Sequence, residues 1–210
     1  MTTRTTQQRA SIIHGYYASP EDHWFGWLAD QLEAAGIATT IPALPNPQDP
    51  DPAQWIATVR DDLGTVEENS IVIAHSLGCL TVLRYLGSLP GPWHLGTLVL
   101  VSGFVDKLPA LPDLDSYIGD GCDVEGLRHH IDRLTVIRSD ADPFVPHGHT
   151  DRLADLLGTA AKVVPGAVRF PPGSGHRFSR TRVLLEGCPL CLLASVGRSR
   201  PSTRSRLPIG

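Results

Sequence analysis

The chain has 210 residues, 41% of them hydrophobic and 19% charged, which is typical of one globular domain with an adequate core. It holds no run of about 18 apolar residues, and MTTRTTQQRA at its start lacks the apolar stretch of a secretion signal, so we expect a cytoplasmic protein with no membrane partner. The net charge is −4, but the segment from Arg169 onward is basic and could bind nucleic acid. Because that segment has no aromatic residues beyond Phe170 and Phe178 and no recognisable nucleic-acid module, we do not expect nucleic acid as a partner.

Six short apolar segments, rich in β-branched residues, predict strands at residues 10–13, 37–41, 70–74, 97–101, 134–138 and 162–164. Apolar residues at three- and four-residue steps follow the first three and predict helices; they are Trp24, Leu28, Leu32 and Ala35, then Trp55, Val59 and Leu63, then Leu80, Leu83 and Leu86. Because the strands are apolar on both faces, the alternation predicts an α/β fold, with a mostly parallel sheet of about six strands covered by helices on both faces.

The loop after the first predicted strand, HGYYASPEDHW, is a place where the backbone can approach a ligand closely, because Gly15 carries no side chain. Ser19 and Pro20 have the residue types of a helix start, with Ser19 as the N-cap. On that helix, His23 and Trp24 would border a pocket, although Trp24 fits the core equally well.

The third predicted strand ends at Ala74-His75-Ser76-Leu77-Gly78, which matches the pattern GxSxG with alanine in place of the first glycine. Small residues two positions before and after the serine let a strand turn sharply into a helix, so that the Ser76 hydroxyl projects at the edge of the sheet. We therefore predict that Ser76 is a nucleophile. The alternative is a serine that only caps the following helix.

A serine nucleophile needs a base to take its proton and an acid to orient that base, and after such a turn they follow in the order Asp, His. The fifth predicted strand runs into SDADPFVP, where Asp142 is our choice because a proline stiffens its turn, with Asp140 in reserve; both could simply be turn residues. Of the histidines that follow, His147 and His149 are within seven residues of Asp142, on the same loop or at the start of the next helix. His176, in PPGSGHRF, lies in a glycine-rich loop after the last predicted strand and is therefore the predicted base.

Acyl transfer also needs donors for the oxyanion. The predicted donors are the backbone N–H of Leu77, which starts the helix after the nucleophile, and that of Tyr16 in the loop after the first strand. His14, Gly15 and His75 adjoin these positions and are the predicted pocket residues.

Residues 103–133 interrupt the alternation with proline, glycine and weak periodicity. An insertion that follows a strand in an open α/β sheet is well placed to roof a site at the carboxyl ends of the strands. The equally weighted alternative is a solvated connector.

Metal and redox chemistry have little support. His129 and His130 are adjacent, His147 and His149 are two apart, and no HExxH occurs, so we expect neither a metal nor another cofactor. The four cysteines are too few and too unevenly spread for a disulfide framework, and we interpret the single CxxC near the end of the chain as coincidence; they are Cys79, Cys122, Cys188 and Cys191.

HGYYASPEDHWFGWL, AHSLGC and SDADPFVP, in this order, resemble the small serine hydrolases related to the retinoblastoma-binding serine hydrolase, a compact branch of the α/β-hydrolases. The similarity covers about residues 10–168. It implies an α/β-hydrolase-like three-layer sandwich without a cofactor, in which Ser76 is the nucleophile, Asp142 the acid, and Tyr16 with Leu77 the oxyanion donors.

The resemblance further implies hydrolysis of a small ester, thioester or amide through an acyl-enzyme, as in a carboxylesterase. We expect a small-molecule acyl substrate and a monomer, and a protein partner stays open. The alternative is a weak or inactive hydrolase-fold protein that acts as a binding module.

The pattern departs from the family after the last predicted strand. Arg169 stands where relatives carry the catalytic histidine of a GHF segment, and a glycine–histidine pair follows only at residues 175–176. Either the loop has lengthened and His176 reaches Ser76, or the reading frame has slipped near Ala167.

The composition after residue 168 favours the second account. Eight arginines face one acid, Glu186, and the segment is rich in Pro and Ser without apolar periodicity. We therefore expect one domain over residues 1–168 and an atypical segment over 169–210, frame-shifted or disordered.

Overall fold

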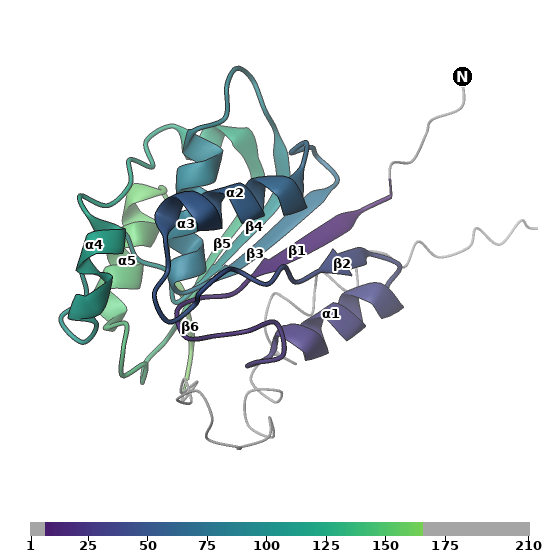
Figure 1. Ribbon diagram of the computed structural model, residues 1–210. Coiled ribbons are helices and arrows are strands. Elements are labelled where there is room, and N and C mark those ends of the chain that lie inside the picture. Colours follow the sequence, from purple (N-terminus) through teal and green to yellow (C-terminus); the bar gives the residue numbers. More distant parts are fainter. Residues whose placement is uncertain (1–6, 166–210) are drawn as a thin grey trace, which may run out of the picture.

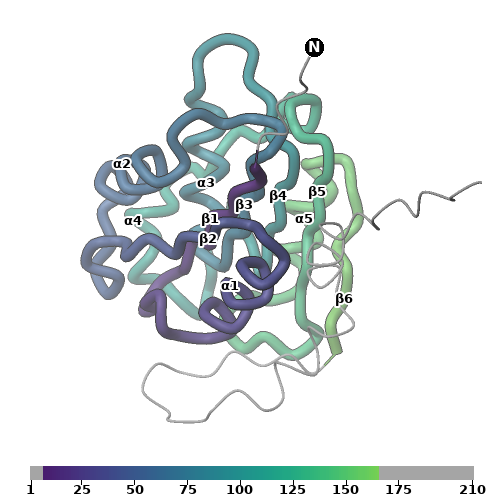
Figure 2. Tube along the Cα trace, turned by 90° about the vertical axis from the view of Figure 1, so that its right-hand side faces the viewer, coloured from purple at the N-terminus to yellow at the C-terminus, as the bar shows by residue number. Residues whose placement is uncertain are grey.

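Six strands form a single sheet in residues 7–165, the part of the chain that the computed structural model describes. They are β1 (Arg9–Ile13), β2 (Ala38–Thr40), β3 (Ser70–His75), β4 (Leu95–Val101), β5 (Ile131–Ser139) and β6 (Lys162–Val164). The order across the sheet is β2-β1-β3-β4-β5-β6 with every pairing parallel, and Figure 2 shows β6 at the edge beside β5. All six predicted strands are confirmed, although β4 and β5 begin earlier than predicted.

Helices cover both faces of the sheet (Figure 1). On one face lies α1 (Phe25–Ala34), and on the other lie α2 (Pro52–Leu63), α3 (Leu77–Gly87) and α5 (His147–Leu156). This confirms the predicted three-layer α/β sandwich. Among residues 7–165, no helix has the length and apolar character needed to span a bilayer.

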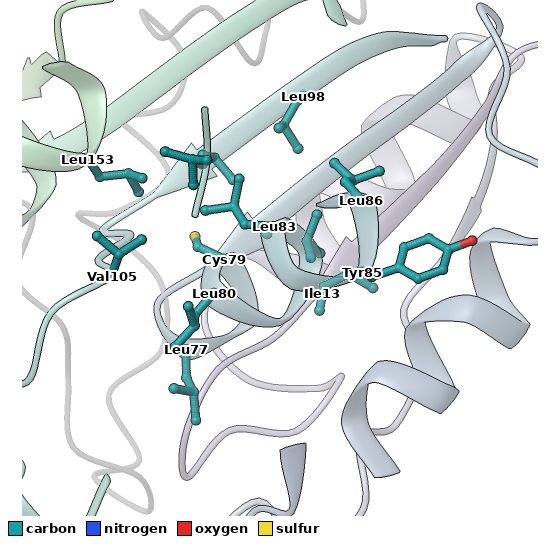
Figure 3. Close-up of a cluster of buried hydrophobic side chains, with 14 of the residues drawn as sticks. Ile13, Leu77, Cys79, Leu80, Leu83, Tyr85, Leu86, Leu98, Val105 and Leu153 are labelled. Carbon is teal, nitrogen blue, oxygen red and sulfur yellow. The ribbon is translucent and has the colours of Figure 1, made fainter. Parts of the chain in front are cut away.

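Strand β3 shows how the sequence builds the two cores. Ile71 and Ile73 pack in the cluster on the α1 side, while Val72 and Ala74 pack in the larger cluster beneath α2 and α3. Successive side chains of a strand point to opposite faces, so a strand buried on both faces must be apolar throughout. Figure 3 shows part of the larger cluster, with side chains of α3 lying among residues of β1, β4 and α5.

The predicted start of the first helix is wrong. Ser19 does not cap a helix: the carboxylate of Asp22 accepts hydrogen bonds from its N–H (2.8 Å) and its hydroxyl (2.9 Å), which closes a turn. His23 then adopts a φ of 53°, which no α-helix contains, and α1 begins only at Phe25. Trp24 is buried with the α1-side core.

The connection between β4 and β5 contains only short helices, η1 (Pro112–Leu114), α4 (Asp115–Ile118) and η2 (Leu127–His130). It is nevertheless fastened to α3. The Tyr117 hydroxyl lies 2.7 Å from that of Thr81, and the Arg84 guanidinium donates to the carbonyls of Tyr117 (2.8 Å) and Ile118 (2.7 Å). The segment is therefore packed into the larger core and is not a solvated connector.

The predicted domain boundary after residue 168 and the atypical segment 169–210 both lie outside the described residues.

Candidate active site

Ser76 lies on a strained turn between β3 and α3. Its φ of 56° and ψ of −124° fall in a region that side-chain-bearing residues rarely occupy, at a cost of about 1–3 kcal/mol. The turn is held from both sides: Ser76 N–H donates to the carbonyl of Val101 on β4 (2.9 Å), and the Ser76 carbonyl accepts from Cys79 N–H (2.9 Å). The predicted sharp strand-to-helix turn is thus present.

The alternative role of Ser76 as a helix cap is wrong. The residue occupies the N-cap position of α3, but its side chain makes no capping hydrogen bond. None of the side chains or backbone groups in residues 7–165 forms a hydrogen bond with its Oγ, although the atom is buried. A buried hydroxyl that none of these residues binds is costly to stability, which points to a role beyond structure.

Close backbone and side-chain contacts around Ser76 leave room only for small residues, as the sequence predicted. A Cβ on Gly78 would lie 2.3 Å from the carbonyl oxygen of His14, so α3 can start beside β1 only with glycine there. A Cβ on Gly15 would lie 2.7 Å from the Ser76 Cβ and 3.2 Å from its Oγ. The loop that contains Gly15, between β1 and α1, therefore lies directly over Ser76.

Ser76 is less exposed than the sequence predicted, because this loop covers it. We expected the hydroxyl to project at the edge of the sheet, whereas Ser76 has an exposed fraction of 0%. The physical reason includes the close approach of Gly15, which shields the side chain from the β1 side. The side chain of Ser76 therefore lies between the loop that contains Gly15 and the start of α3.

The two predicted oxyanion donors are the backbone N–H groups of Leu77 and Tyr16. Leu77 is the first residue of α3, so its N–H has no acceptor within the helix. In the described part of the chain, no group accepts from the N–H of Tyr16 either, while the next residue, Tyr17, donates to Pro47 (2.9 Å). Neither of the two predicted oxyanion donors therefore has a backbone acceptor among the described residues.

The side chain of Tyr16 packs against the larger core. It is half-buried and packs edge-on against Tyr17 at 4.7 Å between ring centroids. Burial raises the pKa of Tyr16, helped by the negative charges of Asp113 and Asp49. The phenol is therefore neutral at physiological pH.

The predicted acid lies in a fixed turn after β5. Asp142 is half-buried, and its Oδ1 accepts from the backbone N–H groups of Phe144 (3.0 Å) and Val145 (3.1 Å). Asp140 is exposed. The structure therefore favours Asp142 over Asp140 as an oriented carboxylate, at the same edge of the sheet as Ser76.

The predicted base, His176, and Arg169 lie outside the described residues. Several of the histidines inside that range have other partners or positions. His94 pairs with Asp132 (2.6 Å), His130 bonds the carbonyl of Trp93 (3.0 Å), and His147, at the start of α5, is largely exposed. These histidines do not serve Ser76.

His75, a predicted pocket residue, lies on the α1 side of the sheet. It is buried, and its ring lies 5.1 Å from that of His23, 5.5 Å from Phe25 and 5.9 Å from Trp24. The ring of His14 instead lies on the α2 side, where it meets Trp55 edge-on at 5.9 Å.

Sequence reasoning missed one neighbour of the site. The N–H of Leu44 donates to Nε2 of His14 (3.0 Å) across 30 residues of chain, and no local pattern marks Leu44. In residues 7–165, no group of three His, Cys, Asp or Glu side chains could hold a metal ion.

The sequence of this chain is similar to those of known proteins. A family model described as serine hydrolase matches residues 10–185. The YdeN protein of Bacillus subtilis (strain 168) is 38% identical over 164 residues, covering 78% of this chain and 86% of YdeN. The serine hydrolase RBBP9 of Rattus norvegicus is 25% identical over 136 residues, covering 64% of this chain and 70% of RBBP9.

Solved structures show the same fold. The crystal structure of the ydeN gene product of B. subtilis has a TM-score of 0.72 and 37% identity, covering 75% of this chain and 85% of that one. Est1E from Butyrivibrio proteoclasticus, at 14% identity, has a TM-score of 0.58 and covers 91% of this chain and 85% of its own. The fold is that of the α/β-hydrolases.

Proposed function

This chain belongs to the serine hydrolase family, and from that premise we propose that Ser76 is the nucleophile of an enzyme that cleaves a small ester, thioester or amide through an acyl-enzyme. The observation that carries the proposal is the Ser76 turn. A residue in a strained conformation holds a buried Oγ that no group in residues 7–165 binds, and the backbone N–H groups of Tyr16 and Leu77 have no backbone acceptor in the same range. Strain and an unpartnered polar atom together are typical of catalytic residues.

The proposed reaction has two halves. Ser76 Oγ attacks the carbonyl carbon of the acyl group while a histidine takes the hydroxyl proton, and the carbonyl oxygen becomes an oxyanion bound by the N–H groups of Tyr16 and Leu77. The bond to the leaving group then breaks, and the histidine returns the proton to that group. Water repeats the sequence on the acyl-enzyme, which releases the acid and restores the serine.

We propose His176 as this base and Asp142 as the carboxylate that orients it. Val164, the last residue of β6, pairs with Ser139 at the end of β5, so the chain leaves the sheet beside the Asp142 turn. From β6 to β3 is three strand spacings, about 14 Å. The chain from Pro165 to His176 can extend over more than about 30 Å, so His176 is within reach of Ser76.

The extent of the family match also supports this base, because residues 10–185 include His176. The competing account is a slipped reading frame that leaves Arg169 at the inherited position. Translation of the other two frames from codon 165 would then reveal a GHF-like segment. Esterase activity gained by Arg169→His and unaffected by His176→Ala would favour this account and contradict ours.

The decisive experiment is covalent labelling with a fluorophosphonate probe. We expect the wild type to be labelled and Ser76→Ala to be spared. Ser102→Ala is the matched control, because Ser102 is also a buried serine with positive φ (49°) at the carboxyl end of the neighbouring strand β4. Folded wild-type protein that takes no label, or label that persists in Ser76→Ala, would contradict the proposal.

The base is tested in the same assay. His176→Ala should label at least about 10²-fold more slowly than the wild type, since an unactivated serine is a poor nucleophile. His149→Ala, which changes a half-buried histidine on α5, should label at the wild-type rate.

A further inference from the structure

His14 is buried beside the nucleophile, and both of its ring nitrogens bind backbone. Only 1% of the residue is exposed. Nε2 lies 3.0 Å from the N–H of Leu44, which can only donate, so Nε2 accepts and carries no proton. Nδ1 must then carry the proton, and it lies 3.1 Å from the carbonyl oxygen of Gly15. The hydrogen bonds thus define a neutral imidazole with the proton on Nδ1.

We propose that His14 in this form is a positioning residue that orients the Gly15–Tyr16 peptide, and so aims the N–H of Tyr16 at the oxyanion. The Gly15 carbonyl accepts from Nδ1–H of His14 and from the N–H of Ala18 (3.2 Å). In a trans peptide the C=O and N–H point in opposite directions. Fixing the carbonyl on the His14 side therefore turns the Tyr16 N–H away from it. The inference rests on the proposed hydrolase function.

The surroundings of His14 hold the ring in place. Trp55 of α2 meets the ring edge-on, at 5.9 Å and 74°, and donates its indole N–H to the carbonyl of Pro45 (2.7 Å). Pro45 follows Leu44, so the same loop is anchored by Trp55 and donates to His14. A group fixed on two sides keeps its orientation without rearrangement during the reaction, which is the condition for effective oxyanion stabilisation.

Protonation would break this arrangement. A proton on Nε2 would face the N–H of Leu44, donor against donor. Burial lowers the pKa of His14, and the opposing effects are the hydrogen bond to Gly15 and the negative charges of Asp22 and Glu21, the charged groups on the loop around it. Trp55 of α2, Leu44 of the β2–α2 loop and Gly78 of α3 lie against His14, and none of these three is titratable.

The first test reads the tautomer without any turnover. In ¹⁵N-labelled full-length protein at neutral pH, long-range ¹H–¹⁵N spectra of His14 should show a protonated Nδ1 and a bare Nε2. The amide signal of Tyr16 should shift in step with acid titration of the ring. A proton on Nε2, or a Tyr16 amide indifferent to the His14 titration, overturns the proposal whether or not the protein is a hydrolase.

The second test is kinetic. His14→Phe should lower kcat on a simple ester by about 10²-fold with KM changed less than about three-fold, because orientation of an oxyanion donor acts in the transition state. His14→Gln, which offers both a donor and an acceptor, should recover part of the loss. His130→Phe is the matched control, since His130 also bonds a backbone carbonyl and stacks on a tryptophan, and it should keep the wild-type kcat.

The outcomes separate the two proposals. If the wild type is neither labelled nor able to hydrolyse an ester, the proposed hydrolase function is contradicted. The spectra then still test whether His14 orients the Gly15–Tyr16 peptide. An active wild type whose kcat is unchanged in a folded His14→Phe overturns the positioning role. Should His14→Phe fail to fold, the Tyr16 amide of the wild type decides, because protonation of the catalytic base also lowers kcat in acid. That amide must shift along the His14 titration, and an amide that does not follow it overturns the role.

Discussion

Residues with positive φ occur at both ends of the sheet, but the residue types differ between the two ends. In residues 7–165, every residue other than glycine with positive φ lies in a connection that leaves the carboxyl end of a strand; these are Tyr17, His23, Asn46, Ser76 and Ser102. The connections that lead from a helix into the amino end of a strand use glycine instead, at Gly36, Gly64, Gly91 and Gly158.

The difference indicates where side chains matter. Left-handed backbone costs a side-chain-bearing residue about 1–2 kcal/mol and costs glycine almost nothing. At the amino end nothing opposes glycine, so the turns are unstrained. At the carboxyl end the strained positions carry side chains, and Ser76 is one of them, as expected if this end carries the chemistry.

The largest expected effect contrasts two carboxylates from opposite ends. Asp142→Asn should lower kcat by up to about 10⁴-fold, because the base loses the group that orients it. Asp132→Asn removes the partner of His94 at the amino end, a surface pair worth at most about 1 kcal/mol, and should leave kcat unchanged. Steady-state kinetics on a simple ester distinguishes them, and equal losses in both variants would contradict the assignment of chemistry to one end.

The next effect is on stability. Gly78→Ala would place a Cβ 2.3 Å from the carbonyl oxygen of His14, a rigid backbone atom, and should lower the free energy of unfolding by about 3 kcal/mol. Gly26→Ala in α1 meets nothing within 4 Å and should raise it by about 0.5–1 kcal/mol. Urea unfolding measures both changes. Equal stabilities of the two variants would mean that α3 does not approach β1 as described.

A pH dependence follows from the buried ring of His14. Burial lowers its pKa in the folded state below the 6.5 of the unfolded chain, so the unfolded chain binds the proton more readily. The stability that the neutral ring contributes is therefore complete above pH 6.5 and is lost as the pH falls from there through the folded pKa. Urea midpoints at several pH values below 6.5 should fall less steeply in His14→Phe than in the wild type.

The sequence predicted what depends on short patterns. Apolar periodicity located all six strands, and the small residues around Ser76 located the turn, because both signals lie within a few residues. The start of α1 was missed because a serine followed by proline resembles a cap, while the actual partner of Ser19 is the Asp22 side chain.

Contacts between distant segments could not be predicted from such patterns. Leu44 and His14 meet only after β1 and β2 pair, and Gly78 meets the carbonyl of His14 only after α3 packs on β1. The burial of Ser76 has the same origin, since it depends on where the Gly15 loop comes to lie. The sequence located the chemical groups of the candidate site, whereas their mutual orientation required the fold.

The smallest expected effect comes from exchanging residue types between the ends. Ser102→Gly should raise the free energy of unfolding by about 1 kcal/mol, because glycine accepts the φ of 49° without strain. Gly91→Ala, at a φ of 69° with open space around the Cβ, should lower it by a similar amount. Differential scanning calorimetry resolves changes of this size, and the comparison between the ends requires opposite signs. If both substitutions destabilised the protein equally, the serine side chain would be contributing to the fold itself, and strain at the carboxyl end would no longer indicate function.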